Sequence, residues 1–168
     1  MGRYVVMGVA GAGKSLIGSA LARALGVDFV EGDAYHPPEN VARMAAGIPL
    51  TDDDRLGWLR ALADRLAEAA AAEEGLVMAC SALKRKYRDL LRAGDPTVRF
   101  ILLRGPEALL AERLAARRGH YMPASLLGSQ LATLENPGPD EGAWACDVAA
   151  TPDAIVAALV ALATRPSA

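Results

Sequence analysis

The sequence predicts a three-layer α/β/α fold in which helices cover both faces of a parallel five-stranded sheet. Short apolar runs, suited to buried strands, alternate along the chain with longer segments whose apolar residues recur at helical spacing. Glycine or proline often marks the point where one kind of segment gives way to the next. No internal repeat, low-complexity linker or charge block divides the 168 residues, so we expect one domain over 1–168.

The five expected strands are short, apolar and separated by helical patterns. They cover residues 4–7, 28–31, 76–80, 98–103 and 144–148. Runs of this kind are typical of strands that are buried on both faces. Their alternation with helices indicates parallel strand–helix–strand units rather than hairpins.

The expected helices have recognisable ends. Gly26 is suited to end the first, and Thr151 followed by Pro152 is suited to begin the last. A long amphipathic helix should begin after Thr51, whose hydroxyl can cap it, with the acidic segment 52–54 in its first turn. The remaining helices are expected at about 39–46, 107–117 and 123–134.

Composition and charge narrow the class of protein. Apolar residues make up 52% of the chain and charged residues 23%, as in globular proteins. The formal net charge of −2 gives no general attraction to nucleic acid or to an anionic membrane. Cys80 and Cys146 lack the spacing of a zinc or redox motif, and we expect buried, reduced thiols. With no signal-like or span-length apolar stretch, a cytoplasmic protein is expected.

A glycine-rich motif stands between the first strand and the first helix. Residues 8–15 match G-x-x-x-x-G-K-[ST], and the flanking strand and helix are those that this motif requires. Its glycines allow successive backbone N–H groups to face an anion, and the helix adds the positive end of its dipole. Lys14 would reach the β- and γ-phosphates, and the Ser15 hydroxyl would bind Mg²⁺. The residues expected to bind ATP here are Gly8, Gly11, Ala12, Gly13, Lys14 and Ser15.

The rest of the chain favours a small kinase over other nucleotide-binding proteins. It lacks the Asn-Lys-x-Asp segment with which GTPases bind guanine, and it is too short for a large motor ATPase. Phosphoryl transfer requires positive charge around the moving group. Arg113, Arg117 and Arg118, next to Gly119, are suited to supply it from a lid at about 113–135. Arg113 and Arg117 are assigned to ATP, and Arg117 also to catalysis; a solvated helix face is the alternative for any single arginine.

The acceptor site should lie where the second and third strands end, because open α/β sheets bind ligands at that edge. Asp33 follows the second strand and is suited to accept or orient the proton of a hydroxyl group. His36 lies three residues further on, in a polar loop. Lys84 and Arg88, at i and i+4 after the third strand, are expected on one helical face. Two cations facing a cleft indicate an anionic acceptor.

Two further residues are candidates for the acceptor site. Arg55 would add a third cation, although it is equally suited to pair with the neighbouring aspartates. His120 lies in a polar loop, where a hydrogen bond to a polyol is more plausible than a place in the core.

The order and spacing of these segments closely resemble those of the bacterial gluconate kinases, from Val6 to about Pro139. The resemblance is carried by Gly32-Asp33 with His36-Pro37, Asn40 and Met44; Gly47-x-Pro49-Leu50; 52–55 with Trp58-Leu59; 80–84 with 87–89; and Arg117-x-Gly119-His120 with Gln130 and 133–135. It implies ATP-dependent phosphorylation of D-gluconate at the 6-hydroxyl by a cytoplasmic homodimer. It also implies that Gln130 contacts the substrate.

Two alternatives remain at this point. A shikimate-type kinase shares the expected fold, but usually carries Asp-x-Asp after the second strand and a glycine triplet after the third. This chain has Gly32-Asp33-Ala34 and Ser81-Ala82-Leu83 there. A nucleotide-binding regulatory protein without turnover would be favoured if Lys14 or Asp33 were missing, and both are present.

Overall fold

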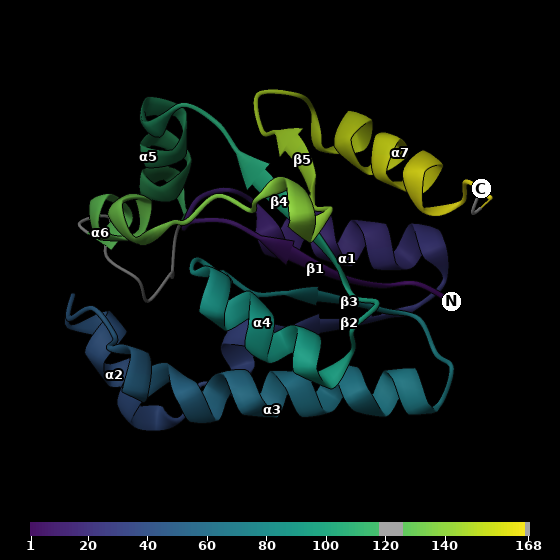
Figure 1. Cartoon of the computed structure of the whole chain (residues 1–168). Helices are drawn as coiled ribbons and strands as arrows, with labels where there is room; N and C mark the ends of the chain where they lie inside the picture. Colours follow the sequence, from purple (N-terminus) through teal and green to yellow (C-terminus); the bar gives the residue numbers. More distant parts are fainter. Residues whose placement is uncertain (118–125, 167–168) are drawn as a thin grey trace.

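The computed structural model describes residues 1–117 and 126–166 and contains a parallel five-stranded sheet (Figure 1). The strand order is β2-β3-β1-β4-β5. Val5 in the central strand pairs with Met78 on one side and with Phe100 on the other. The strands are β1 (Arg3–Met7), β2 (Asp28–Glu31), β3 (Leu76–Ala79), β4 (Arg99–Arg104) and β5 (Trp144–Asp147).

Helices cover both faces of this sheet. Helices α1 and α7 lie on one face and α3 and α4 on the other, while α2, α5 and α6 gather near the end where the strands terminate (Figure 1). The described helices are α1 (Lys14–Leu25), α2 (Pro38–Ala45), α3 (Asp52–Ala71), α4 (Arg85–Gly94), α5 (Glu107–Ala116), α6 (Leu126–Thr133) and α7 (Pro152–Ala163). The predicted three-layer α/β/α fold is confirmed. None of the helices in the described ranges is long and apolar enough to cross a membrane.

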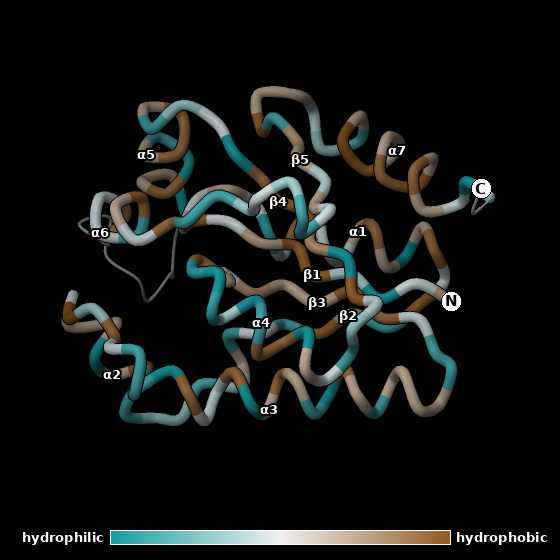
Figure 2. The backbone as a smooth tube through the Cα atoms, in the orientation of Figure 1, coloured by the Kyte–Doolittle hydropathy of each residue, from teal (hydrophilic) through white to brown (hydrophobic). Residues whose placement is uncertain are grey.

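The core consists of two apolar layers, one on each face of the sheet. Successive side chains of a strand point to opposite faces, so Val6 packs in the α1–α7 layer and Val5 in the α3–α4 layer. Figure 2 shows the resulting hydrophobic strands between helices of mixed polarity. Burial on both faces explains why the central strands are continuous apolar runs.

The predicted caps form as expected. The Thr51 hydroxyl accepts a hydrogen bond from the Asp54 N–H at 3.1 Å, and the Asp54 carboxylate accepts one from the Thr51 N–H at 2.9 Å. This reciprocal pair begins α3. The Thr151 hydroxyl likewise caps α7.

Three details differ from the prediction. Short 3₁₀ turns form at Gly32–Tyr35 and Pro139–Glu141, where no helix was predicted. Cys80 is buried as predicted, but Cys146 is only partly buried. The reason is that β5 is an edge strand, so one of its sides lacks the neighbour that shields the central strands.

Candidate active site

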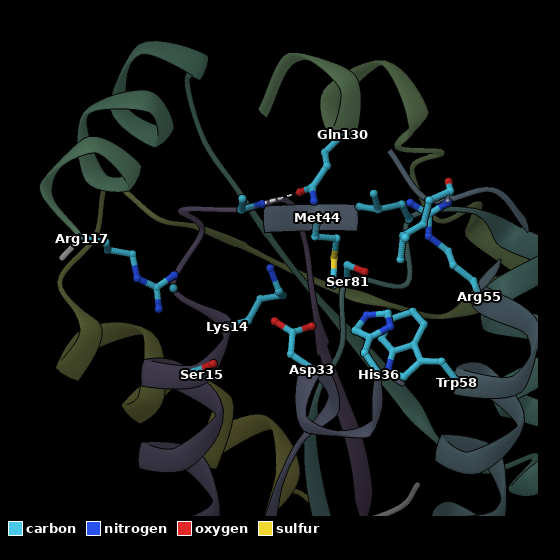
Figure 3. A pocket seen from close by; sticks show the side chains of 14 residues that line it. Lys14, Ser15, Asp33, His36, Met44, Arg55, Trp58, Ser81, Arg117 and Gln130 are labelled. Atoms are coloured by element: carbon cyan, nitrogen blue, oxygen red, sulfur yellow. Dashed lines mark hydrogen bonds between the residues drawn. The ribbon is translucent and has the colours of Figure 1, made fainter. Parts of the chain in front are cut away.

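A cleft opens where the parallel strands end, as the topology requires (Figure 3). Residues far apart in the sequence converge on it: Lys14 and Ser15 begin α1, and Gln130 lies on α6. Asp33 and His36 reach it from the turn after β2.

The glycine-rich loop after β1 has the backbone that an anion-binding loop needs. Gly8 and Gly11 have φ values of 143° and 82°, which side-chain-bearing residues rarely adopt. A Cβ atom at these positions would lie 2.7 Å from the Leu103 carbonyl oxygen and 2.6 Å from that of Leu110. No side chain caps the N-terminus of α1, so its first N–H groups remain available to an anionic ligand.

Lys14 places an ammonium group in the cleft. The side chain is half-buried, and its Nζ donates a hydrogen bond to the Val9 carbonyl at 3.0 Å. Burial lowers the pKa of Lys14, while the nearby Asp33 and Glu31 carboxylates act in the opposite direction. The two carboxylates therefore help to keep the ammonium charged while no phosphate is bound.

Glu31 is a site residue that the sequence analysis missed. It ends β2, and its carboxylate accepts a hydrogen bond from the Ser15 hydroxyl. The available signal was a Glu-x-Asp pair, Glu31 and Asp33, at the end of a strand. Oxygen ligands of this kind suit Mg²⁺. Among the described residues there is no group of three or more His, Cys, Asp or Glu that could hold a metal by itself. One hydroxyl and one carboxylate, from Ser15 and Glu31, fit a Mg²⁺ ion that is bound largely through nucleotide phosphates.

His36 lies flat against Trp58 on the opposite wall of the cleft (Figure 3). The ring centroids are 4.0 Å apart and the planes differ by 18°. Trp58 is fixed in turn, because its Nε1–H donates to the Gly32 carbonyl at 2.8 Å. Burial lowers the pKa of His36 to about 4, so the ring is neutral near pH 7.

A second chamber of about 220 Å³ adjoins the cleft, and the two share Leu50 and Gln130 in their walls. Arg55 borders both parts, and Lys84 lines the second. The Arg55 Nη1 donates to the Leu50 carbonyl at 2.7 Å and to the Tyr87 hydroxyl at 3.1 Å. These two bonds hold one edge of the guanidinium in place.

Asp52 gathers several donors at the mouth of this chamber. Its carboxylate accepts hydrogen bonds from the Tyr87 hydroxyl and from the ammonium groups of Lys84 and Lys86. The donors hold the pKa of Asp52 well below its usual range, so it is ionised throughout the physiological range. Tyr87 therefore links Arg55 to the carboxylate that holds Lys84.

The prediction that Arg88 faces the cleft with Lys84 is wrong. Arg88 is completely buried, and its guanidinium donates to Glu141 Oε1 at 2.7 Å, to Glu141 Oε2 at 3.1 Å and to the Ala82 carbonyl at 2.9 Å. The Arg88 N–H donates to the Lys84 carbonyl at 3.2 Å, but Lys84 is the cap that precedes α4 and has an extended backbone, so its side chain does not follow the helical direction. The two side chains diverge, and Arg88 belongs to the framework that supports the loop after β3.

The predicted lid residues are only partly described. Arg117 is the C-cap that follows α5 and lines the cleft, whereas Arg113, one turn earlier, is not among the residues that line it. His120 lies outside the described residues. Gln130 lines the cleft and also accepts a hydrogen bond from the Ala10 N–H at 2.7 Å, which joins α6 to the phosphate loop (Figure 3).

A phosphate loop, a lysine and strand-end carboxylates on a three-layer α/β/α fold define a P-loop kinase of small molecules. A family model described as "AAA domain" matches residues 4–137. A curated gluconokinase from Gluconobacter oxydans is 49% identical over 156 residues, which cover 93% of this chain and 88% of that protein. The chain belongs to the gluconokinase family.

Two solved structures agree with this assignment. A gluconokinase from Sinorhizobium meliloti is 53% identical, with a TM-score of 0.86 over 96% of this chain and 91% of that one. An unliganded sugar kinase from Janibacter sp. HTCC2649 is 47% identical, with a TM-score of 0.92 over 96% and 93% of the two chains. At this identity and coverage, the likeness extends to sequence as well as fold.

Proposed function

We propose that this protein transfers the γ-phosphoryl group of Mg²⁺-bound ATP to the 6-hydroxyl of D-gluconate, giving 6-phospho-D-gluconate and ADP. The observation that carries the proposal is one continuous cleft, with a phosphate loop at one end and a chamber bordered by Arg55 and Lys84 at the other. The gluconokinase relatives support the choice of acceptor.

At the phosphate end, backbone N–H groups of residues 8–15 and the N-terminus of α1 would bind the β- and γ-phosphates. Lys14 and Arg117 would stabilise the charge that develops on the transferring group. The Ser15 hydroxyl is suited to bind Mg²⁺, and the Glu31 carboxylate to hold a water on the ion. When bound, Mg²⁺ would neutralise phosphate charge and orient the leaving group.

At the acceptor end, Asp33 would orient the reacting hydroxyl and accept its proton. Asp33 and Lys14 line the same part of the cleft, so the hydroxyl and the γ-phosphate would meet there. The carboxylate of the acceptor would lie at the far end, near Arg55 and Lys84. His36 and Gln130 also line the cleft and would contact the other hydroxyl groups of the acceptor molecule.

Other parts of the proposal rest on the sequence and on the resemblance to the family. They are the contact of Arg113 with ATP, that of His120 with the substrate, and a lid at about 113–135. They also include one domain over 1–168, a homodimer, and a cytoplasmic location without nucleic acid or membrane partners.

The test is an ADP-release assay with Mg·ATP against D-gluconate, shikimate, other aldonates and neutral sugars such as D-glucose. We expect turnover on D-gluconate far above the rest, with the phosphate located on O6 by NMR of the product. Turnover on shikimate would favour the shikimate-type alternative. ATP binding without turnover on any acceptor would favour a regulatory protein, and either result would overturn the proposal.

A further inference from the structure

We propose that Asn40 is a positioning residue that fixes the tautomer of His36, so that the ring donates from Nε2–H to an acceptor hydroxyl. The proposal rests on the proposed function for the identity of the ligand. It assigns His36 as a hydrogen-bond donor and leaves acceptance of the proton to Asp33.

The orientation of the Asn40 amide is set by the backbone. Asn40 lies on α2 and is 2% exposed. Its Nδ2 lies 2.8 Å from the carbonyl oxygen of Asp54. A carbonyl oxygen can only accept, so this end of the amide must be the NH₂ group.

The same NH₂ group faces His36. Asn40 Nδ2 lies 3.3 Å from His36 Nδ1. Because an amide NH₂ group only donates, Nδ1 must be unprotonated to accept this hydrogen bond. Burial and the Arg55 charge lower the pKa of His36 to about 4, although Asp33 opposes them, so the ring carries one proton near pH 7. That proton must be on Nε2.

The ring is held so that this proton can be used. Stacking on Trp58 fixes the plane of the imidazole, and the backbone N–H of His36 donates to the Asp33 backbone carbonyl at 3.2 Å, which anchors the residue. Within the described part of the chain, Nδ1 is the ring nitrogen with a hydrogen-bonding partner, and His36 lines the cleft beside Asp33 (Figure 3). Nε2–H is thus available to a ligand.

The chemistry separates the roles of the two residues. An ionised carboxylate only accepts, so Asp33 suits the hydroxyl that loses its proton. A donor to that same oxygen would compete for the lone pair needed for attack. We therefore assign the Nε2–H of His36 to the hydroxyl next to the reacting one, where it would orient the end of the acceptor chain.

The first test needs no substrate and is read on the wild-type protein, with a variant used only to assign the signals. The chain has two histidines, so long-range ¹H–¹⁵N spectra of the histidine-labelled protein can be assigned with His36→Gln. We expect His36 as a single neutral Nε2–H tautomer between pH 6 and 8. Averaged shifts of two exchanging tautomers, a charged ring or an Nδ1–H tautomer would overturn the proposal, whether or not the protein phosphorylates gluconate.

The second test reverses the donor. Asn40→Asp places an acceptor opposite His36 Nδ1, so we expect Nδ1 to become protonated. The KM for gluconate should then rise about tenfold, with the KM for ATP unchanged. Glu39→Gln, an exposed neighbour on α2, is the matched control and should change neither spectrum nor KM. If Asn40→Asp folds, as judged by circular dichroism, and keeps both the wild-type ¹⁵N shifts and the wild-type KM, the proposal is wrong.

Discussion

Replacing Glu141 by Gln should destabilise the protein strongly, because Glu141 neutralises a completely buried arginine. Its side chain is 1% exposed and that of Arg88 is 0% exposed. The Glu141 carboxylate accepts two bonds from Arg88, one from Arg92 at 2.7 Å and one from the Gly138 N–H at 2.9 Å. A neutral amide removes the charge and presents an NH₂ group to donors.

The expected loss follows from the burial of the pair. Removing one partner of a buried ion pair costs about 3–5 kcal/mol, because the other charge is left without compensation. For a domain of this size, each kcal/mol lowers the melting temperature by about 2–4 °C. We therefore expect the melting temperature to fall by roughly 10 °C. The loss of about 3–5 kcal/mol is a large part of the free energy of unfolding of an ordinary domain.

The effect should depend on pH with a definite sign. Burial alone would raise the pKa of Glu141, but the bonds from Arg88, Arg92 and the Gly138 N–H outweigh it and lower the pKa to about 2. A carboxyl group with a depressed pKa stabilises the fold fully above its unfolded value of about 4.5. This stabilisation is lost as the pH falls toward 2. The difference in free energy of unfolding between the wild type and Glu141→Gln should therefore become smaller in acid.

Urea unfolding at pH 7 and in acid measures this difference in free energy of unfolding. The matched control is Asp140→Asn in the same 3₁₀ turn, since Asp140 pairs with Arg85 at the surface. Exposed ion pairs contribute little to stability, so we expect the free energy of unfolding of Asp140→Asn to match that of the wild type. If Glu141→Gln lost less than about 1 kcal/mol at pH 7, the framework role of Arg88 would be refuted.

Three further substitutions test the active site. Lys14→Ala should lower turnover about a hundredfold or more while leaving thermal unfolding unchanged, because it removes transition-state charge; near-normal turnover would contradict the phosphate-loop assignment. Glu31→Gln should weaken Mg²⁺-dependent nucleotide binding about tenfold in calorimetry, because it removes the partner of Ser15; unchanged Mg²⁺ dependence would exclude this role. Tyr87→Phe removes the hydroxyl between Arg55 and Asp52 and should raise the KM for gluconate about two- to tenfold, the equivalent of one hydrogen bond, without changing that for ATP. A change confined to ATP would show that the division of the cleft is wrong.

The sequence by itself determined the layers of the fold and the phosphate end of the site. Strand and helix periodicity, caps such as Thr51 and the motif at 8–15 depend on residues within a few positions of one another. Asp33 was also accessible, because the end of a parallel strand is the place where such sheets bind ligands. These features are local, so a linear pattern can report them.

The tertiary structure alone decided which of the cations after the third strand faces the cleft. Arg88 and Lys84 are both cations near the start of one helix, yet Arg88 is neutralised by Glu141, 53 positions away, and Lys84 by Asp52, 32 positions away. The donor role of His36 likewise depends on an amide whose orientation is set by a carbonyl from another helix. The cost of burying a charge or a polar group is offset only by a partner in the right place, and the folded chain determines that place.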